Sequence, residues 1–471
     1  MAWNAINRPN VNPAANPAFQ ENTTVTGKGT SARRQFAWLE RSKYWLELPQ
    51  TEWRAQKVLG MGNYAIAGLF SYIGSDSTKP RQLVVKQSNT TVEAALQLES
   101  KILHLTTGTG TDHIVKLYKG CHRAGGTGTG ENDPLPYYNG AYNENMEVAR
   151  IYLEYASGGD GQALLDQISR TKNYVIPEEH LWRILDCLAR ACLVLEQGSE
   201  DTTFADPNWR PICHFDIKPE NVLIGSLDQG QHQTIQAFKL ADFGLSVFEA
   251  SQADRQTDVW KNATQWRATA EWMSPEQYFG FTAGTPFRDI SAMTNIWAIG
   301  AVIHRLISNS RLAIARSFMY QKAFVGSIRV TGDPNTILNN TIFPYSEDFV
   351  DTLCGCLAHD PAQRTKPAEL IAHTTYILNF YDGQNTPFVP NALRVKNTAN
   401  FNIPPTGHFM QNFPPSTRPK SISAPLGGQW PIIGLPVSPD SNQHPLLFAQ
   451  ARKATQMPKN QYPFTDLLAT P

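Results

Sequence analysis

The segment CHFDIKPENVLIG, Cys213 to Gly225, gathers three chemically active side chains in one short stretch. Asp216 can accept or donate a proton, and Lys218 supplies a positive charge two residues later. Asn221 offers an amide oxygen that can bind a hard metal ion. Phe215, which can do none of these things, directly precedes the aspartate. The segment therefore predicts an acid-base and metal site, and it raises the question of what the aromatic side chain does there.

Length and charge limit the classes of protein to which the chain can belong. Its 471 residues have room for two or three domains, and a hydrophobic content of 41% is enough for a sizeable core. The 41 lysines and arginines balance 41 aspartates and glutamates, so no net field attracts nucleic acid or an anionic membrane. The most apolar run, Ile296 to Ile307, is interrupted by His304 and Arg305 and is too short for a membrane span.

The N-terminal sequence and the cysteines favour an intracellular protein, in the cytoplasm or the nucleus. The start, MAWNAINRPN, lacks the basic and apolar segments of a secretory signal. The six cysteines have no paired spacing, and Cys354 and Cys356 are only two positions apart. This distribution favours reduced thiols and indicates no zinc site.

Composition divides the chain into three parts. Residues 1–52 are predicted to form a flexible arm, because the first 35 or so are rich in Asn, Pro, Ala and Thr and show no apolar period. Residues 381–471 are predicted to form a disordered tail, since 15 of the 32 prolines follow residue 382. The globular part is predicted to cover residues 53–380.

The globular part begins with strands and continues with helices, which predicts an α+β protein in two lobes. Short β-prone runs lie at Lys57–Leu59, Ile66–Tyr72, Gln82–Gln87, Ile114–Tyr118 and Val148–Tyr155. Apolar residues three and four apart predict helices over Val92–Leu105 and Glu178–Gln197. A segment rich in Gly, Asn and Tyr, Gly120–Asn145, is predicted to be a long surface loop.

Two further motifs have the residue types of a phosphate site. Gly60 and Gly62 lie between two strands, where backbone N–H groups can approach phosphate oxygens closely. Lys86 interrupts an apolar strand, and Glu99 follows it by 13 residues on the next helix. Taken singly, the glycines fit an ordinary hairpin, the lysine fits an edge strand, and the glutamate fits a solvated helix face.

A second acidic motif, Asp242-Phe243-Gly244, lies 26 residues after Asp216. Two predicted strands, Val222–Ile224 and Phe238–Leu240, lie between the two motifs. A strand pair of this kind can bring Asn221 and Asp242 together as oxygen ligands for Mg²⁺.

These motifs, taken in order over about residues 53–380, resemble those of a eukaryotic protein kinase of the serine/threonine branch. The resemblance implies a bilobal protein-kinase fold, with a small β-rich N-lobe at about 53–153 and a helical C-lobe at about 157–380. It also implies transfer of the γ-phosphoryl group of ATP, with Mg²⁺, to hydroxyl groups of protein substrates.

The resemblance also assigns roles to individual residues. ATP would be bound by a glycine-rich loop, a lysine, the hinge and a ribose contact: Gly60, Gly62, Lys86, Leu153, Glu154, Tyr155, Ala156 and Asp160. Catalysis would use a base, a phosphate-contacting lysine, the lysine–glutamate pair and a threonine: Asp216, Lys218, Lys86, Glu99 and Thr269. The metal ligands would be Asn221 and Asp242. A buried ion pair is expected between Glu276 and Arg364.

Two departures from the family pattern concern the opening segment. Phe215 replaces the arginine of the family's His-Arg-Asp motif, and Asn295 stands where the family has an aspartate. An arginine at the first position pairs with a phosphate on the activation loop, which Phe215 cannot do. We hypothesise that the two changes are coupled, and that apolar packing of Phe215 replaces loop phosphorylation.

Two functions from different classes fit the sequence. The first is an active kinase with protein substrates. The second is a nucleotide-binding pseudokinase scaffold, which would recruit partners through the proline-rich tail. The chain retains Lys86, Asp216, Asn221 and Asp242 together, and a scaffold has no physical need for all four. The sequence therefore favours the enzyme.

Overall fold

The structure is a computed structural model that describes residues 30–42, 45, 48–61, 65–89, 93–124, 148–170, 175–227, 232, 235–279, 289–322, 326–339 and 345–382. These residues form two compact units. The first extends to Gly108 and includes Val115–Tyr155, and the second consists of Thr109–Ile114 and the residues from Ala156 onwards. No helix among the described residues is long and apolar enough to cross a membrane.

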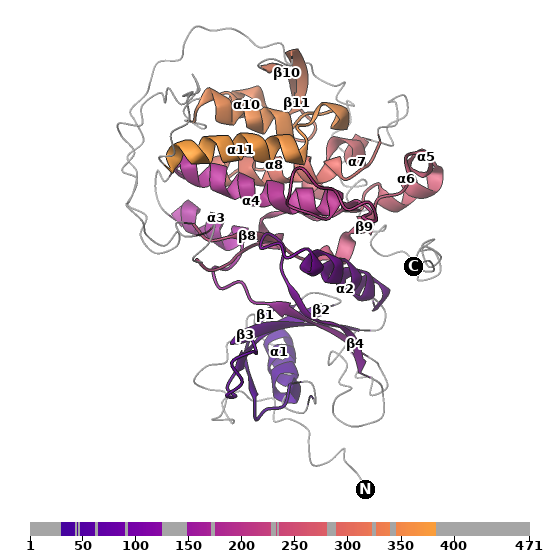
Figure 1. The fold of residues 1–471 in the computed structure, drawn as a ribbon, viewed down its shortest axis with the longest axis vertical. Coiled ribbons are helices and arrows are strands. Elements are labelled where there is room, and N and C mark those ends of the chain that lie inside the picture. Colours follow the sequence, from indigo (N-terminus) through magenta and orange to yellow (C-terminus); the bar gives the residue numbers. More distant parts are fainter. Residues whose placement is uncertain are drawn as a thin grey trace. The chain divides into compact units, whose positions relative to one another are not determined.

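The first unit is built on one antiparallel sheet (Figure 1). Its strand order is β1-β2-β3-β5-β4. The bounds of the strands and of the helix α2 are β1 Trp53–Met61, β2 Ala65–Tyr72, β3 Gln82–Asn89, β4 Leu117–Ala124, β5 Val148–Glu154 and α2 Glu93–Gly108. β3 lies between β2 and β5, so both of its edges are hydrogen-bonded. Its Leu-Val-Val sequence suits this central position, because side chains of this kind pack well on a pleated surface.

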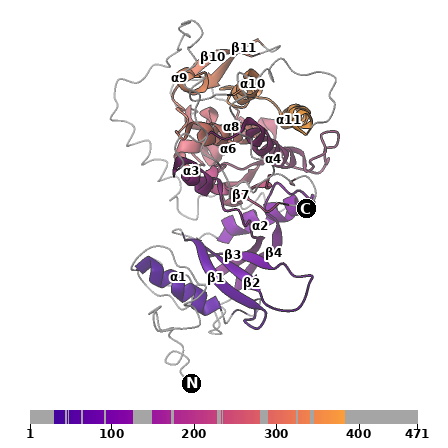
Figure 2. The ribbon, with the colours of Figure 1, turned by 90° about the vertical axis from the view of Figure 1, so that its left-hand side faces the viewer.

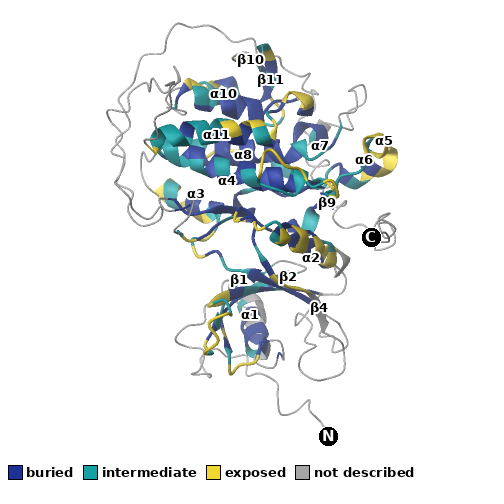
Figure 3. Cartoon of the chain, viewed as in Figure 1, coloured by how far each residue is buried: buried dark blue, intermediate teal, exposed yellow. Residues whose placement is uncertain are grey.

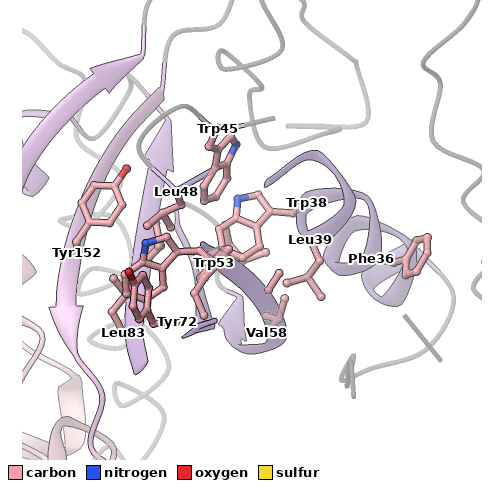
Figure 4. Packing of buried hydrophobic residues seen from close by; sticks show 14 residues of the cluster. Phe36, Trp38, Leu39, Trp45, Leu48, Trp53, Val58, Tyr72, Leu83 and Tyr152 are labelled. Carbon is pink, nitrogen blue, oxygen red and sulfur yellow. The ribbon is translucent and has the colours of Figure 1, made fainter. Parts of the chain in front are cut away.

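A helix also precedes the sheet. The predicted flexible arm 1–52 differs from the structure here, because Thr30–Arg41 forms α1, which packs on β1 (Figure 2). Trp38 and Leu39 project from α1 toward the sheet and are almost fully buried (Figure 4). A Cβ atom on Gly68 of β2 would lie only 2.4 Å from the ring of Trp38, so this close packing requires glycine. The apolar residues of this short helix therefore complete the core on one face of the sheet.

Two predictions for the chain between α2 and β5 need correction. Ile114 makes only an isolated bridge to Leu240, and β4 begins later, at Leu117. β4 also continues to Ala124, into the segment predicted as a loop, because its backbone pairs with β5 as far as Val148. The rest of that predicted loop, from residue 125, lies outside the described residues.

The second unit is mainly helical and is centred on α4 and α8, which Figure 3 shows as largely buried. α11 and α8 both pack against α4. The α-helices are α3 Gly161–Arg170, α4 Glu178–Gln197, α5 Gln252–Arg255, α6 Asp258–Thr264, α7 Pro275–Phe279, α8 Met293–Ser308, α9 Pro334–Ile337, α10 Glu347–Cys356 and α11 Pro367–Tyr381. Helix α4 has the bounds predicted from its apolar spacing.

Short strands and 3₁₀ turns carry the chemically active segments of the second unit. The antiparallel strand pairs are β6 Ile212–Cys213 with β9 Val247–Phe248, β7 Val222–Ile224 with β8 Phe238–Leu240, and β10 Ser317–Lys322 with β11 Gly326–Thr331. The 3₁₀ turns are η6 Pro219–Asn221, η7 Phe243–Leu245, η8 Ala270–Trp272 and η9 Pro361–Gln363. The predicted pair β7–β8 is present, and it places η6 next to the segment that follows β8.

Candidate active site

The sheet of the first unit and α2 together position Lys86. This residue lies within β3, opposite Ala67 of β2 and Ile151 of β5. Its Nζ contacts both carboxylate oxygens of Glu99 on α2, each at 2.8 Å. The Glu99 side chain is 2% exposed, whereas that of Lys86 is 18% exposed. The lysine thus neutralises a buried carboxylate while remaining in contact with solvent, and the expected pair is present.

The structure says less about the other residues of the first unit that are expected to bind the nucleotide. Gly60 is exposed near the end of β1, and a Cβ there would meet no atom within 4 Å. Packing among the described residues therefore does not require glycine at this position. Gly62 lies outside the described residues. Glu154 is the last residue of β5, and its side chain accepts the N–H of Lys116 at 3.1 Å.

Ala156 and Asp160 lie at the start of the second unit. Ala156 is buried. The Asp160 Oδ1 accepts the N–H of Ala163 at 2.8 Å, so it caps the first turn of α3. A Cβ on Gly161 would lie 2.8 Å from the backbone oxygen of Pro219, so only glycine allows α3 to approach η6 this closely. Asp160 therefore has a capping role that the sequence did not reveal, and it is held next to the segment that carries Asp216.

Asp216 is at the centre of a hydrogen-bonded cluster and is 6% exposed. Its Oδ1 accepts from the Thr269 hydroxyl at 2.6 Å and from the Thr269 N–H at 3.3 Å. Its Oδ2 accepts from Asn221 Nδ2 at 2.8 Å and lies 2.9 Å from Lys218 Nζ. Lys218 also donates to the Thr269 hydroxyl at 2.8 Å. The structure thus brings together the four residues of the second unit that the sequence assigned to the base, its lysine, its threonine and one metal ligand.

Asn221 and Asp242 are the expected metal ligands. Asn221 Nδ2 also donates to the Asp216 carbonyl at 2.7 Å, and these two bonds fix which way its amide faces. The N–H of Ala241 donates to the Asn221 carbonyl at 2.9 Å, so the chain that carries Asp242 is anchored beside Asn221. Asp242 is exposed and has left-handed backbone geometry, with φ of 61°. An amide oxygen and a carboxylate are hard oxygen donors, so this pair fits Mg²⁺.

His214 connects these two segments, and the sequence did not reveal this role. Its Nδ1 accepts the N–H of Asp216 at 3.2 Å, and its Nε2 lies 3.1 Å from the Ala241 carbonyl. One ring nitrogen therefore accepts and the other donates, which is the pattern of a neutral imidazole. Burial lowers the pKa of His214, which agrees with this form.

Phe215 packs into an apolar cluster. The cluster consists of Cys213, Phe215, Val247, Trp260 and Ile290. Phe215 has φ of 64°, a left-handed conformation that costs a side chain of this size about 1–2 kcal/mol. It is 5% exposed, and burial of an aromatic ring contributes about 1.5–3 kcal/mol. Burial therefore offsets the backbone cost, and Trp260 of α6, in the loop after Asp242, is part of what buries the ring.

Asn295 of α8 forms two hydrogen bonds with the backbone that precedes Asp216. Its Oδ1 accepts the N–H of His214 at 2.9 Å, and its Nδ2 donates to the Ile212 carbonyl at 2.8 Å. An aspartate could accept the first bond but could not donate the second. The amide is therefore the group that satisfies both backbone atoms.

Ion pairs hold the same loop at a second point. Arg255 of α5 donates to both carboxylate oxygens of Asp289, at 2.8 Å each, and also pairs with Glu249. The other oxygen of Glu249 accepts the N–H of Ala292 at 2.5 Å. The loop after Asp242 is therefore held against the residues before α8 by ion pairs that need no phosphate group on the loop.

The expected ion pair between Glu276 and Arg364 is present and fully buried. The two guanidinium nitrogens donate to the two carboxylate oxygens at 2.7 and 2.5 Å. Both side chains are 0% exposed. Arg364 also donates to the carbonyls of Ala358 and Met293, at 2.9 Å each. This pair links α7 to the segment between η9 and α11.

The chain has α+β architecture, with a lysine–glutamate pair in its sheet unit and a cluster of Asp216, Lys218, Asn221 and Thr269 in its helical unit. Residues 53–376 match the protein kinase domain. The chain therefore belongs to the eukaryotic protein kinase family, and the predicted family and fold class are confirmed.

Similar proteins include protein kinases from several organisms. The G2-specific protein kinase nimA of Emericella nidulans is 27% identical over 254 residues, covering 50% of this chain and 32% of that protein. The Arabidopsis thaliana serine/threonine-protein kinase RUNKEL is 30% identical over 240 residues, 51% of this chain and 14% of that protein. The human serine/threonine-protein kinase ULK3 is 25% identical over 223 residues, covering 47% of this chain and 38% of that protein. The chain thus spans less than two fifths of the length of these relatives.

A similar solved structure is that of the CAK complex from Chaetomium thermophilum bound to ATP-gamma-S. It has a TM-score of 0.46 at 20% identity and covers 71% of this chain and 93% of that chain.

Proposed function

We propose that this protein is a serine/threonine protein kinase that transfers the γ-phosphoryl group of ATP to hydroxyl groups of protein substrates. The observation that carries the proposal is the cluster around Asp216. Its carboxylate is buried, is held in one orientation by Thr269 and Asn221, and lies 2.9 Å from the cation of Lys218. A base held in this way needs little reorganisation when a hydroxyl group binds. The family, and relatives named as serine/threonine kinases, support the same activity.

Each polar group of the site then has a role in the transfer. The substrate hydroxyl oxygen forms a bond to the γ-phosphorus while the bond to the β-phosphate bridging oxygen breaks, and Asp216 accepts the hydroxyl proton. Lys218 neutralises charge on the transferred group, and Lys86, held by Glu99, binds the phosphates of the nucleotide. Asn221 and Asp242 would hold Mg²⁺, which neutralises phosphate charge when bound. Gly60, Gly62, Glu154, Ala156 and Asp160 would contact the nucleotide.

The test uses the full chain with labelled ATP, Mg²⁺ and a degenerate library of serine and threonine peptides. Asp216→Ala should reduce transfer at least 100-fold while ATP binding persists, because the base contacts the hydroxyl group and not the nucleotide. Asp166→Ala is the matched control, since Asp166 is exposed on α3 and should leave the rate unchanged. Wild-type turnover in the Asp216→Ala protein would refute the role of this residue. Absence of transfer by wild-type protein that binds ATP would favour the scaffold.

We further propose that the kinase works without phosphate on the loop after Asp242. Phe215 offers no charge to receive a phosphate, and the ring of Trp260 packs in its cluster instead. Arg255, which could meet a phosphate, is already paired with Asp289 and Glu249. Phosphatase-treated protein, verified by mass spectrometry, should keep its rate. A ten-fold loss that one loop phosphate restores would contradict the proposal.

A further inference from the structure

A second group of chemically active side chains lies in the helical unit. His113 lies between α2 and β4, Cys187 on α4, and His232 in the connection between β7 and β8. All three side chains are buried, and their ligand atoms, one from each residue, lie within 4.8 Å of one another. The two imidazole rings meet edge to face, with centroids 5.2 Å apart. Three segments that are distant in sequence therefore place two nitrogens and a sulfur around one point.

One imidazole of the group is held by a carboxylate. Glu200 Oε1 lies 2.8 Å from His113 Nδ1, and the hydroxyl of Thr111 donates to the same oxygen. The other ring nitrogen, His113 Nε2, is buried and has no hydrogen-bond partner among the described residues. A histidine that donates one N–H to a carboxylate and presents its other nitrogen to a buried point has the arrangement of a metal ligand with its supporting shell.

The chemistry of the group favours a borderline-soft cation. A thiolate and two imidazoles are ligands for zinc and related transition metals, whereas Mg²⁺ and Ca²⁺ prefer oxygen ligands. The thiolate is the form of cysteine that binds metals, so a cation at this point would be bound by one sulfur and two nitrogens.

The distances agree with a zinc ion after a small adjustment. Zinc binds nitrogen at about 2.0–2.1 Å and sulfur at about 2.3 Å, so two ligands of a tetrahedral ion lie about 3.3–3.7 Å apart. The present upper limit of 4.8 Å requires the side chains to move inward by about 1 Å or less.

We propose that His113, Cys187 and His232 bind one Zn²⁺ ion, with a water molecule in the fourth position and Glu200 orienting His113. The ion would join α4 to the connection between α2 and β4 and to the connection between β7 and β8. The His113 carbonyl accepts the N–H of Leu240 at 2.9 Å, and Leu240 is two residues before Asp242. The ion would therefore stabilise the strand that presents Asp242, and this role does not depend on the proposed phosphoryl transfer.

The first test measures zinc in the untagged full chain after dialysis against a chelating resin. Wild-type protein should hold one zinc per chain by mass spectrometry of the metals. Cys187→Ser and His232→Gln should each lower the zinc content at least ten-fold. Cys192→Ser is the matched control, because Cys192 is also buried on α4 but lies outside the group. Less than 0.1 zinc per chain in the wild type, or equal content in wild type and Cys187→Ser, would overturn the proposal.

A second measurement needs no variant to fold. Metal-free wild-type protein titrated with Co²⁺ should develop a thiolate-to-cobalt charge-transfer band and the visible bands of a tetrahedral site, saturating at one equivalent. Added Zn²⁺ should bleach both. The melting temperature of the metal-free protein should rise by several degrees with stoichiometric Zn²⁺. Absence of the charge-transfer band would overturn thiolate ligation, and with it the proposed site.

Discussion

Replacing Asn295 with aspartate tests how the backbone before Asp216 is held. The change keeps an oxygen for the N–H of His214 but removes the donor to the Ile212 carbonyl. Removal of the donor leaves a buried carbonyl without its partner, which costs about 1–3 kcal/mol. Asn295 is only 2% exposed, so water cannot replace the donor. We expect Asn295→Asp to lower the free energy of unfolding by about 1–3 kcal/mol.

The double variant tests whether Asn295 and Phe215 are coupled. Phe215→Arg alone places a cation among Val247, Trp260 and Ile290 and should also destabilise the protein. With Asn295→Asp, the new cation and the new carboxylate can neutralise each other, so the combined loss should be smaller than the sum by about 1 kcal/mol or more. The assay is urea unfolding of the full chain, followed by tryptophan fluorescence and circular dichroism.

A control double variant distinguishes charge pairing from a general insensitivity of the protein to a second substitution at these positions. Phe215→Arg combined with Asn295→Ala supplies no carboxylate, so its two losses should add. Strict additivity in the Arg–Asp double variant would refute the coupling. An unchanged stability of Asn295→Asp would refute the hydrogen-bond argument itself.

Three other changes have expected outcomes that follow from the geometry. Arg364→Ala leaves Glu276 buried and unpaired, which costs about 3–5 kcal/mol, so differential scanning calorimetry should show a melting temperature lower by several degrees. An unchanged temperature would mean that the pair contributes nothing. Gly68→Ala places a Cβ 2.4 Å from the Trp38 ring and should make α1 susceptible to limited proteolysis, whereas equal cleavage rates would contradict this packing. Trp260→Ala should lower the kinase rate of phosphate-free protein, and full activity would show that the loop is held elsewhere.

The sequence predicted which residues near Asp216 lie close together. Asp216, Lys218 and Asn221 lie in one turn of chain, so their spacing alone brings them together. The strand pair β7–β8 has a short, recognisable pattern, and it brings the segment of Asp242 beside Asn221. These predictions needed only local propensity and the order of the motifs.

Features that depend on packing between distant segments were not predictable in this way. Helix α1 lies in a region whose composition favours disorder, and its tryptophan is buried only because the sheet provides a face for it. In the sequence, Asn295 differs from the family's aspartate only by the loss of a charge. In the structure, its amide N–H group also donates to the Ile212 carbonyl, which no sequence pattern indicates. The His113, Cys187 and His232 group has no paired spacing, because each ligand comes from a different segment.

The packing of α1 also determines where a shortened form of the kinase domain should begin. The match to the protein kinase domain begins at residue 53, which coincides with the start of β1. A truncated chain beginning there would lack Trp38, Leu39 and Trp45, and it would expose the apolar face around Phe70 that these side chains cover. An uncovered apolar face of this kind promotes self-association. Soluble preparations of this kinase domain should therefore start before Thr30, since the folding unit extends beyond the boundary that the family defines.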